Sequence, residues 1–234
     1  MRFRGFVAEA VELSRLPVVQ IEMTGDENCR ELYSYFTRRH ARWRLIENKR
    51  WGVALLLLPE VFVDYPGIAG PYMRRKVNRA TRAGFTVTHV DALTRLDEVL
   101  AVNRSAEERQ GRPMDPDYLN EEAVRRYFER ASDVYGVIDA TGVLRAYISL
   151  RTCGEVTVLD RLLGHAEALD QGVMYLLVME TIRELIGRRQ MDGRPKWFMY
   201  DMFSGGSPGL RQFKHRIGCK PYRVSWSWRD RPRV

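Results

Sequence analysis

Residues 196–218 read KWFMYDMFSGGSPGLRQFKHRIG, and this stretch decides the fold more than any other part of the chain. It starts as an apolar strand that ends at an acidic residue, Asp201. A glycine-rich turn follows, and then a short amphipathic segment that carries Phe213, Lys214 and Gly218. The change from an apolar run to turn residues and then to helical spacing predicts a strand, a turn and a helix. We expect Asp201 at the edge of a central strand.

Composition sets the limits for the whole chain. Its 234 residues, 45% of them hydrophobic, are enough for one large core or two small ones. Cys29, Cys153 and Cys219 are too few and too widely spaced to predict a disulfide framework or a zinc site, and their odd number argues against complete pairing. No signal-peptide pattern precedes them, and the longest apolar run, 51–59, is half the length of a membrane span. We therefore expect a cytoplasmic protein.

Basic residues exceed acidic ones by 38 to 30, which gives a net charge of +8 and favours polyanionic partners. An arginine-rich composition throughout would give the same total, so local clustering is more informative. The clearest cluster lies on a helix expected at 71–84, where Arg75, Arg79 and Arg82 share one face and Arg74 is adjacent. Like charges one turn apart repel unless an anion compensates them, so these arginines are candidates for donor binding. A solvated surface is the alternative.

The expected elements follow one another in an informative order. Strands are expected at 18–23, 52–58, 85–90, 135–140, 143–150, 155–163 and 197–201, and helices at 27–44, 71–84, 96–108, 120–130 and 173–186. Loops are expected at 61–71 and 109–116. The second half of the chain thus gives a meander of antiparallel strands, an apolar helix and a further strand.

This order, together with three motifs, resembles the GNAT superfamily of acyltransferases, and in particular the second domain of the Fem-type aminoacyltransferases. The motifs are the basic helix with its terminal Gly84, the strand that ends at Tyr200-Asp201, and Gly209-Leu210 with Phe213, Lys214 and Gly218. The resemblance covers about 70–226. It implies an α/β (α+β) fold with a GNAT-like mixed, mostly antiparallel sheet flanked by helices. Residues 71–234 would form the acyltransferase domain, and 1–70 an N-terminal elaboration, a strand-helix-strand unit that is part of a GNAT-like domain.

The start of the apolar helix bears on the choice of donor, because a helix N-terminus binds anions. In GNAT enzymes that use acetyl-CoA, small residues at this point let the backbone approach the CoA pyrophosphate. This chain has Gln171 and Gly172 followed by the bulky Val173, Met174 and Tyr175. The resemblance therefore favours aminoacyl-tRNA over acyl-CoA as the co-substrate, with no tightly bound cofactor. Gln171 and Gly172 are candidates for donor binding.

Three residues are candidates for catalysis in such a transfer, which needs a proton acceptor for the amine and a donor for the oxyanion. Asp201 can accept the proton, and its alternative role is to cap the turn at 204–207. Lys214 can neutralise a phosphate or an oxyanion, as the Phe-Lys pair of the resemblance implies, or it is a surface lysine. His165 can act as a base near neutral pH, or it is a hydrogen-bonded anchor in a loop.

The loop at 109–116 is a candidate for substrate binding. Two prolines restrict its backbone, and Arg109 and Arg112 offer planar donors to a carboxylate or phosphate. The alternative is that these arginines pair with Asp115 or Asp117. Tyr147 and Tyr175 are candidates for the wall of the cleft, or for the core.

Several other chemistries have no motif here. The chain lacks a Gly-x-Ser-x-Gly elbow, a phosphate-binding loop, a His-Glu-x-x-His motif and a cysteine pair at metal-binding spacing, so no metal site is predicted. Three functions remain: an aminoacyl-tRNA-dependent transferase acting on a small amine or peptide, an acyl-CoA-dependent GNAT enzyme, and a non-catalytic GNAT-like module that binds RNA or another polyanion.

Overall fold

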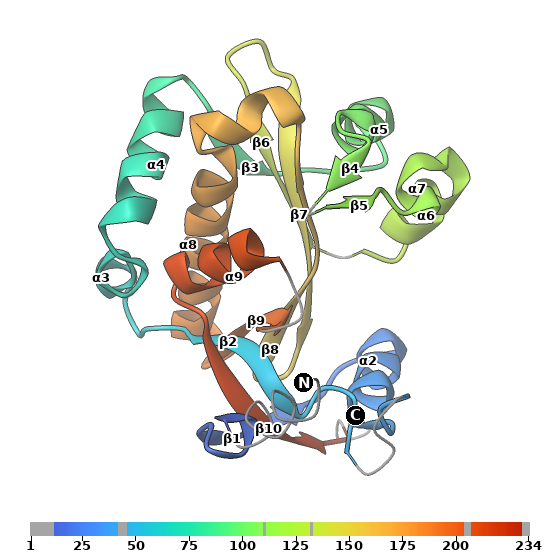
Figure 1. Cartoon of the computed structure of the whole chain (residues 1–234), viewed down its shortest axis with the longest axis vertical. Helices are drawn as coiled ribbons and strands as arrows, with labels where there is room; N and C mark the ends of the chain where they lie inside the picture. Colours follow the sequence, from blue (N-terminus) through green and yellow to red (C-terminus); the bar gives the residue numbers. More distant parts are fainter. Residues whose placement is uncertain (1–11, 42–45, 110, 132, 204–206, 231–234) are drawn as a thin grey trace, which may run out of the picture.

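The computed structural model describes residues 12–41, 46–109, 111–131, 133–203 and 207–230, and eight strands of this part form one sheet. The strands are β1 (Val18–Met23), β2 (Trp51–Leu57), β3 (Thr86–His89), β6 (Asp133–Ile138), β7 (Leu144–Cys153), β8 (Val156–Gly164), β9 (Trp197–Met202) and β10 (Lys220–Trp228). Their order is β1-β10-β2-β9-β8-β7-β6-β3 (Figure 1). Two neighbouring pairs, β1 with β10 and β8 with β9, are parallel, and the others are antiparallel. The prediction of a mixed, mostly antiparallel sheet flanked by helices is confirmed.

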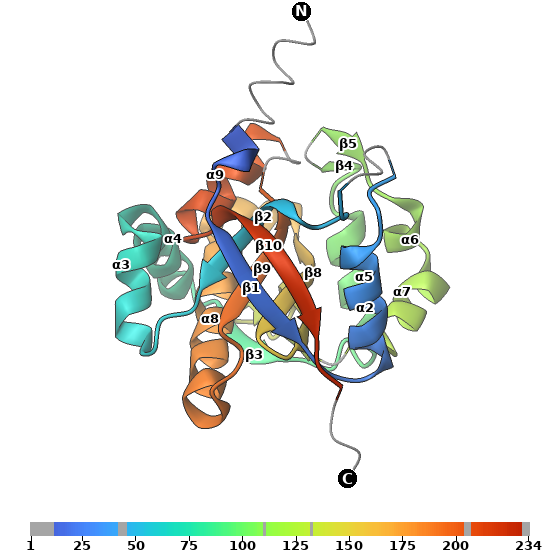
Figure 2. The ribbon, with the colours of Figure 1, turned by 90° about the horizontal axis from the view of Figure 1, so that it is seen from below.

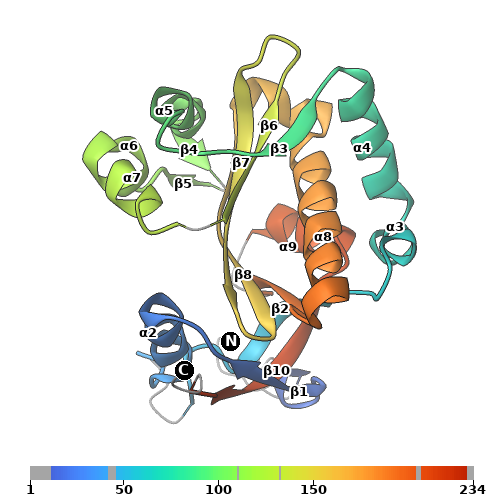
Figure 3. The ribbon, with the colours of Figure 1, turned by 180° about the vertical axis from the view of Figure 1, so that it is seen from behind.

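Helices cover both faces of this sheet. The α-helices are α2 (Glu27–Thr37), α3 (Tyr65–Ala69), α4 (Pro71–Arg82), α5 (Leu96–Arg104), α6 (Pro116–Leu119), α7 (Glu121–Phe128), α8 (Val173–Asp192) and α9 (Pro208–Arg216). Helices α3, α4, α8 and α9 lie on one face, and α2, α5, α6 and α7 lie on the other (Figures 1 and 3). We call these the α8 face and the α2 face. Each face has a buried apolar core of its own, and the one beneath α8 is the largest.

The central meander forms as its turn chemistry predicts. Strands β6 and β7 pair as a hairpin, and the carboxylate of Asp139 accepts the backbone N–H of Thr141 at 2.9 Å in the connecting turn. Gly142 has φ 86°, a left-handed conformation that glycine adopts without steric cost. Strand β8 then pairs antiparallel with β7. The predicted three-stranded meander is therefore confirmed.

The N-terminal residues belong to the same sheet as the rest of the chain. The predicted strand-helix-strand order appears as β1, α2 and β2, with β2 between β9 and β10. Strand β1 runs parallel to β10 at the edge of the sheet (Figure 2). The division at residue 70 therefore does not separate two sheets.

The structure differs from the sequence-based expectations at several places. The segment expected as a loop at 61–71 contains the 3-10 helix η1 (Phe62–Asp64) and α3, because proline is tolerated in the first turn of a helix. The expected loop at 109–116 contains a short hairpin, β4 (Glu108–Arg109) with β5 (Arg112–Pro113). Strand β10 was not predicted, although Val224 and Trp226 alternate with polar residues. Helix α2 ends at Thr37. The expected end of that helix at 42–44 and the glycine turn at 204–206 lie outside the described residues.

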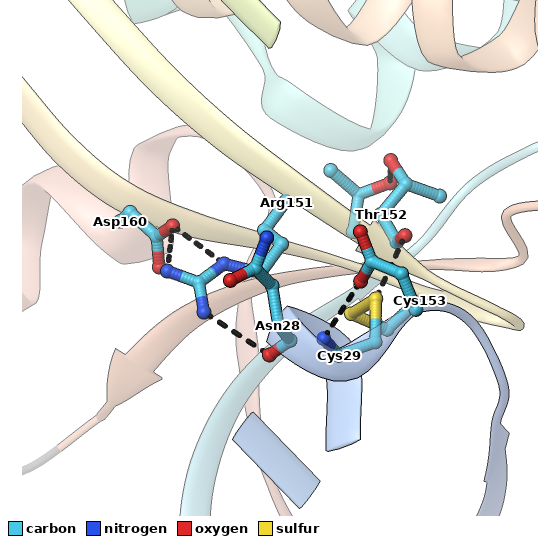
Figure 4. The surroundings of a disulfide bond; sticks show 8 residues. Asn28, Cys29, Arg151, Thr152, Cys153 and Asp160 are labelled. Carbon is cyan, nitrogen blue, oxygen red and sulfur yellow. Dashed lines mark hydrogen bonds and ion pairs between the residues drawn. A yellow bond between two sulfur atoms is a disulfide. The ribbon is translucent and has the colours of Figure 1, made fainter. Parts of the chain in front are cut away.

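The expectation about the cysteines was wrong in one respect. Cys29 of α2 and Cys153 at the end of β7 form a disulfide with a Cα–Cα distance of 5.5 Å, whereas Cys219 is free and buried (Figure 4). The two cysteines are 124 residues apart, and only the packing of α2 on the sheet brings them together. The bridge removes the argument from the cysteines for a cytoplasmic location, because stable disulfides are typical of oxidising compartments.

The apolar run near the N-terminus is a strand, as predicted. It is β2, whose central residues are buried in the sheet. Within the described part of the chain, no helix has the length and apolar character that crossing a membrane requires.

Candidate active site

Strands β8 and β9 part in the middle of the sheet. They pair in parallel from Val156 and Trp197 as far as Val158 and Met199, and the remainder of each strand has no partner on this side. Both strands carry a bulge just beyond the last pair, at Asp160 in β8 and around Asp201 in β9. Bulges re-aim side chains and interrupt pairing, so the two strands diverge here and expose polar backbone groups between them.

A cavity of about 600 Å³ lies over this opening on the α2 face. That volume is in the range typical of small-molecule sites. Helix α2 forms one wall, the β4–β5 hairpin and Tyr118 of α6 form another, and β8 and β9 supply the floor. Seven charged residues line it: Lys49, Arg109, Arg112, Asp115, Asp160, Arg161 and Asp201.

Asp201 lies at the rim of this cavity, as a residue at the end of a strand should. It forms an ion pair with Lys49, whose side chain is only 12% exposed whereas that of Asp201 is 60% exposed. Its backbone has φ 49°, a left-handed conformation that is uncommon for residues other than glycine and is found at functional sites. The ion pair and the bulge together fix the direction of this carboxylate.

Asp160 is a second carboxylate in the cavity. Its Oδ2 accepts hydrogen bonds from Arg151 Nε at 3.2 Å and Nη2 at 2.9 Å, and Arg151 also donates to the backbone oxygen of Asn28 (Figure 4). Burial raises the pKa of Asp160, and the positive charge of Arg151 offsets part of that effect. A buried carboxylate with a raised pKa is a better proton acceptor than an exposed one.

Arg161 follows Asp160 directly, and its guanidinium is stacked between two tyrosine rings. The Cζ atom lies 4.1 Å from the ring centre of Tyr118 and 3.5 Å from that of Tyr127. Tyr127 is held in turn by a hydrogen bond to Ser149 at 2.8 Å. This arrangement holds a positive charge in the wall of the cavity.

The two arginines of the β4–β5 hairpin have different environments. Arg109 donates to the backbone oxygens of Gly164 at 2.9 Å and Val102 at 2.7 Å, so most of its guanidinium holds the hairpin against the end of β8. Burial lowers its pKa. Arg112 is exposed at the mouth of the cavity. Neither arginine pairs with Asp115, whose carboxylate instead caps α6.

Lys214 is buried on the α8 face, on the far side of β9 from the cavity. Only 1% of its surface is exposed, and its Nζ donates to the backbone oxygen of Met202 at 2.5 Å. Burial lowers the pKa of Lys214, against an opposing effect of Asp201. In this position it fixes the end of β9.

The start of α8 is covered by other helices. Gly172 has φ 91°, and a Cβ at this position would lie 2.4 Å from the backbone oxygen of Lys76 in α4. Tyr175 packs against Tyr72 of α4 at 5.5 Å and Phe213 of α9 at 4.8 Å between ring centres. Gln171 is half-buried at the end of the 3-10 helix η2 (Ala166–Gln171).

Two further predicted residues lie apart from the cavity. His165 precedes η2, and its Nδ1 is buried without a hydrogen-bond partner, 3.8 Å from the carboxylate of Glu167. Tyr147 is fully buried beneath α5, and its hydroxyl donates to Asn103 Oδ1 at 2.8 Å. Tyr147 is therefore part of the buried core.

The four arginines of α4 form an exposed basic surface. Arg74, Arg75, Arg79 and Arg82 are all exposed, and none of them forms an ion pair with any residue that the structure describes. A fixed row of unpaired positive charges is suited to a polyanion.

Of the predicted site residues, the cavity therefore brings together Asp201, Arg109 and Arg112. The others lie on the α8 face or in the core: Lys214, His165, Gln171, Gly172, Tyr147, Tyr175 and the α4 arginines. Sequence reasoning missed Lys49, Asp160, Arg161 and Tyr118. One signal was present, because Asp160 and Arg161 are adjacent charges inside an otherwise apolar strand. In the described ranges no group of three or more His, Cys, Asp or Glu side chains is placed to hold a metal ion.

This architecture defines a GNAT-like fold. No protein-family model matches the chain, and no curated protein matches its sequence. Among solved structures, FemX is similar with a TM-score of 0.54 and 10% identity, over 73% of this chain and 59% of FemX. The similarity confirms the predicted relation in fold to the Fem-type proteins.

Two weaker similarities accompany it. One is to the C-terminal domain of a putative lysylphosphatidylglycerol synthetase from Agrobacterium fabrum, with a TM-score of 0.48 and 18% identity over 73% of this chain and 57% of that one. The other is to a GCN5-related N-acetyltransferase from Kribbella flavida, with a TM-score of 0.42 and 15% identity over 74% of this chain and 55% of that one. The chain thus spans less than two thirds of each of the three proteins.

Proposed function

We propose that this protein is an N-acyltransferase that moves an aminoacyl group from aminoacyl-tRNA to the amine of a small acceptor. The observation that carries the proposal is the cavity where β8 and β9 part, which has two carboxylates at its floor and rim. The acceptor occupies the cavity on the α2 face, and the donor carbonyl reaches the opening from the α8 face.

Each step of the transfer has a group to serve it. The carboxylate of Asp160 takes a proton from the acceptor ammonium, and Asp201 orients that amine. The free amine attacks the donor carbonyl, forming a C–N bond. Backbone N–H groups that β8 and β9 do not donate to each other stabilise the oxyanion. The ester C–O bond then breaks, and the departing ribose oxygen of the tRNA takes up the proton that the attacking nitrogen loses as the amide forms.

Two features of the α8 face favour aminoacyl-tRNA as the donor. The exposed arginines of α4 suit a nucleic-acid backbone. The start of α8, where backbone N–H groups would have to meet a diphosphate, is packed against the backbone of α4 at Gly172. An acyl-CoA would therefore lack the site that such a donor needs.

The test is a transfer assay with labelled aminoacyl-tRNAs and a pool of free amino acids, dipeptides and simple amines. We expect the label to appear in a low-molecular-weight amide, with release of uncharged tRNA. A parallel series with acyl-CoA esters should give no product. A product in that series would show that the protein is an acyl-CoA-dependent enzyme instead. Binding of tRNA without transfer from either donor would make the protein a non-catalytic RNA-binding module.

A further inference from the structure

Arg161 has more hydrogen-bonding capacity than its surroundings use. A guanidinium offers five N–H donors. Among the residues that the structure describes, Arg161 forms no hydrogen bond and no ion pair, and its Nη1 is completely removed from solvent. By contrast, the neighbouring Arg151 donates to both Asp160 and Asn28. Leaving buried donors unpaired has a cost in stability, and such groups in native structures call for a partner.

The tyrosines hold this guanidinium ready for a ligand. Tyr118 and Tyr127 stack on its two sides, which attracts the cation to the rings and restricts its rotation. Stacking occupies the faces of the guanidinium, and Nη1 is buried, so Nε and Nη2 form the edge that can bind a ligand. Arginine in this setting recognises planar anions with two parallel hydrogen bonds, and the planar anion of amino acids and peptides is the carboxylate.

The bulge in β8 explains how Asp160 and Arg161 serve one site. Consecutive residues of a regular strand point to opposite faces of the sheet. Here the pairing with β7 shifts between Leu159 and Arg161, and both Asp160 and Arg161 are among the residues that line the cavity on the α2 face. The carboxylate of Asp160, which accepts hydrogen bonds from Arg151, therefore lies beside a guanidinium that forms no ion pair with a described residue.

From these two neighbouring charges we infer that the acceptor carries both an amine and a carboxylate. Arg161 binds the carboxylate, and Asp160 and Asp201 face the amine. The acceptor is thus an amino acid or a short peptide with a free C-terminus, both of which fit a cavity of about 600 Å³. Only the role of this ligand as the acceptor rests on the proposed function. The binding site for an amine and a carboxylate does not depend on the transfer reaction.

The test measures binding alone, by calorimetric titration of the full chain without a donor. The probes are the standard amino acids and L-alanyl-L-alanine, each paired with its C-terminal amide. We expect at least one acid to bind about 10- to 100-fold more tightly than its amide, the range that two charge-assisted hydrogen bonds provide. Equal binding of acid and amide, or no binding of any acid at millimolar concentration, would overturn the inference. The comparison of alanine with the dipeptide distinguishes the two kinds of acceptor.

Variants then assign the effect to Arg161. R161Q should weaken binding of the acid by about 10- to 100-fold and leave binding of the amide unchanged. R161K keeps the charge and the aliphatic stem but not the planar guanidinium, so its affinity for the acid should lie between those of the unchanged protein and R161Q. If R161Q fails to fold, R161K alone tests the role of Arg161. R125Q on α7 removes the same charge from a residue that does not line the site, and it should bind as the unchanged protein does. Unchanged selectivity for the acid in both Arg161 variants would refute the role of Arg161. Loss of transfer with intact binding would refute only the proposed function.

Discussion

At the scale of single residues, neighbours in the sequence have very different roles because of what each one touches. Asp160 is hydrogen-bonded by Arg151, whereas Arg161 is stacked between tyrosines and forms no ion pair with a described residue. Lys214 and Asp201 lie on opposite sides of β9. Lys214 holds the backbone of Met202, and Asp201 lines the cavity.

The raised pKa of Asp160 gives a prediction for the pH dependence of transfer. Only the carboxylate form accepts a proton, so the rate should fall as the pH falls through the pKa of Asp160. Because burial raises this pKa, the acidic limb of the rate profile should lie above the ordinary aspartate value of 3.8. D160N should lower kcat by about 10²- to 10⁴-fold at neutral pH, the usual contribution of a general base.

The matched variant for this measurement is D201N, which removes a carboxylate from the same cavity. We expect D201N to raise KM for the acceptor and to retain the acidic limb. If the limb disappears in D201N and persists in D160N, the proton acceptor is Asp201 instead.

At the scale of elements, helix α4 is where the sequence was most informative. The expected helix at 71–84 forms as α4 from Pro71 to Arg82, with Gly84 at φ 84° just beyond it. Proline in the first turn and glycine after the last are strong local signals, and both depend only on backbone sterics. The burial of Met73 and Ala80 leaves the arginines on the exposed face.

Reversing charges on α4 should therefore affect the donor and not the acceptor. We expect the double substitution R75E/R79E to weaken tRNA binding by more than about 10-fold at low salt. The slope of log K against log salt should fall by about 1 to 2, because fewer counterions are released. Filter binding over a series of salt concentrations would measure both quantities.

The double substitution R125E/R126E on α7 is the control, since it makes the same change of charge on the α2 face. It should leave tRNA binding nearly unchanged. Equal losses of tRNA affinity in the two double variants would mean that the overall positive charge attracts tRNA, and that α4 is not a specific binding site.

At the scale of the whole molecule, the sheet joins segments that are far apart in the chain. Strand β10, near the C-terminus, lies between β1 and β2, which come from the N-terminal part. The Cys29–Cys153 disulfide adds a covalent link between α2 and β7. Since α2 supplies Leu32, Tyr35 and Phe36 to the wall of the cavity, this link also supports the site.

Removing the disulfide should destabilise the fold. Bridging residues 124 apart restricts the unfolded chain strongly, and native disulfides contribute about 2–4 kcal/mol to the free energy of unfolding. We expect the C29S/C153S variant to lose stability in this range in urea-induced unfolding, and to be insensitive to a reducing agent that destabilises the unchanged protein. A reductant that leaves the unchanged protein as stable as before would show that the bridge contributes little.

The sequence by itself determined most of the elements and their order, because caps, turns and apolar periodicity act over a few residues. The resemblance of that order to the GNAT superfamily predicted the class of fold, and the sequence placed Asp201 at the end of a strand and arginines in the 109–116 segment. Only the tertiary structure decided the disulfide, the pairing of β1 with β10 and the composition of the cavity. Those features depend on contacts between residues more than a hundred positions apart, and on bulges whose effect appears only when neighbouring strands are in place. The placement of Asp160 and Arg161 around one cavity illustrates this limit, since alternation along a strand predicts that they face opposite ways.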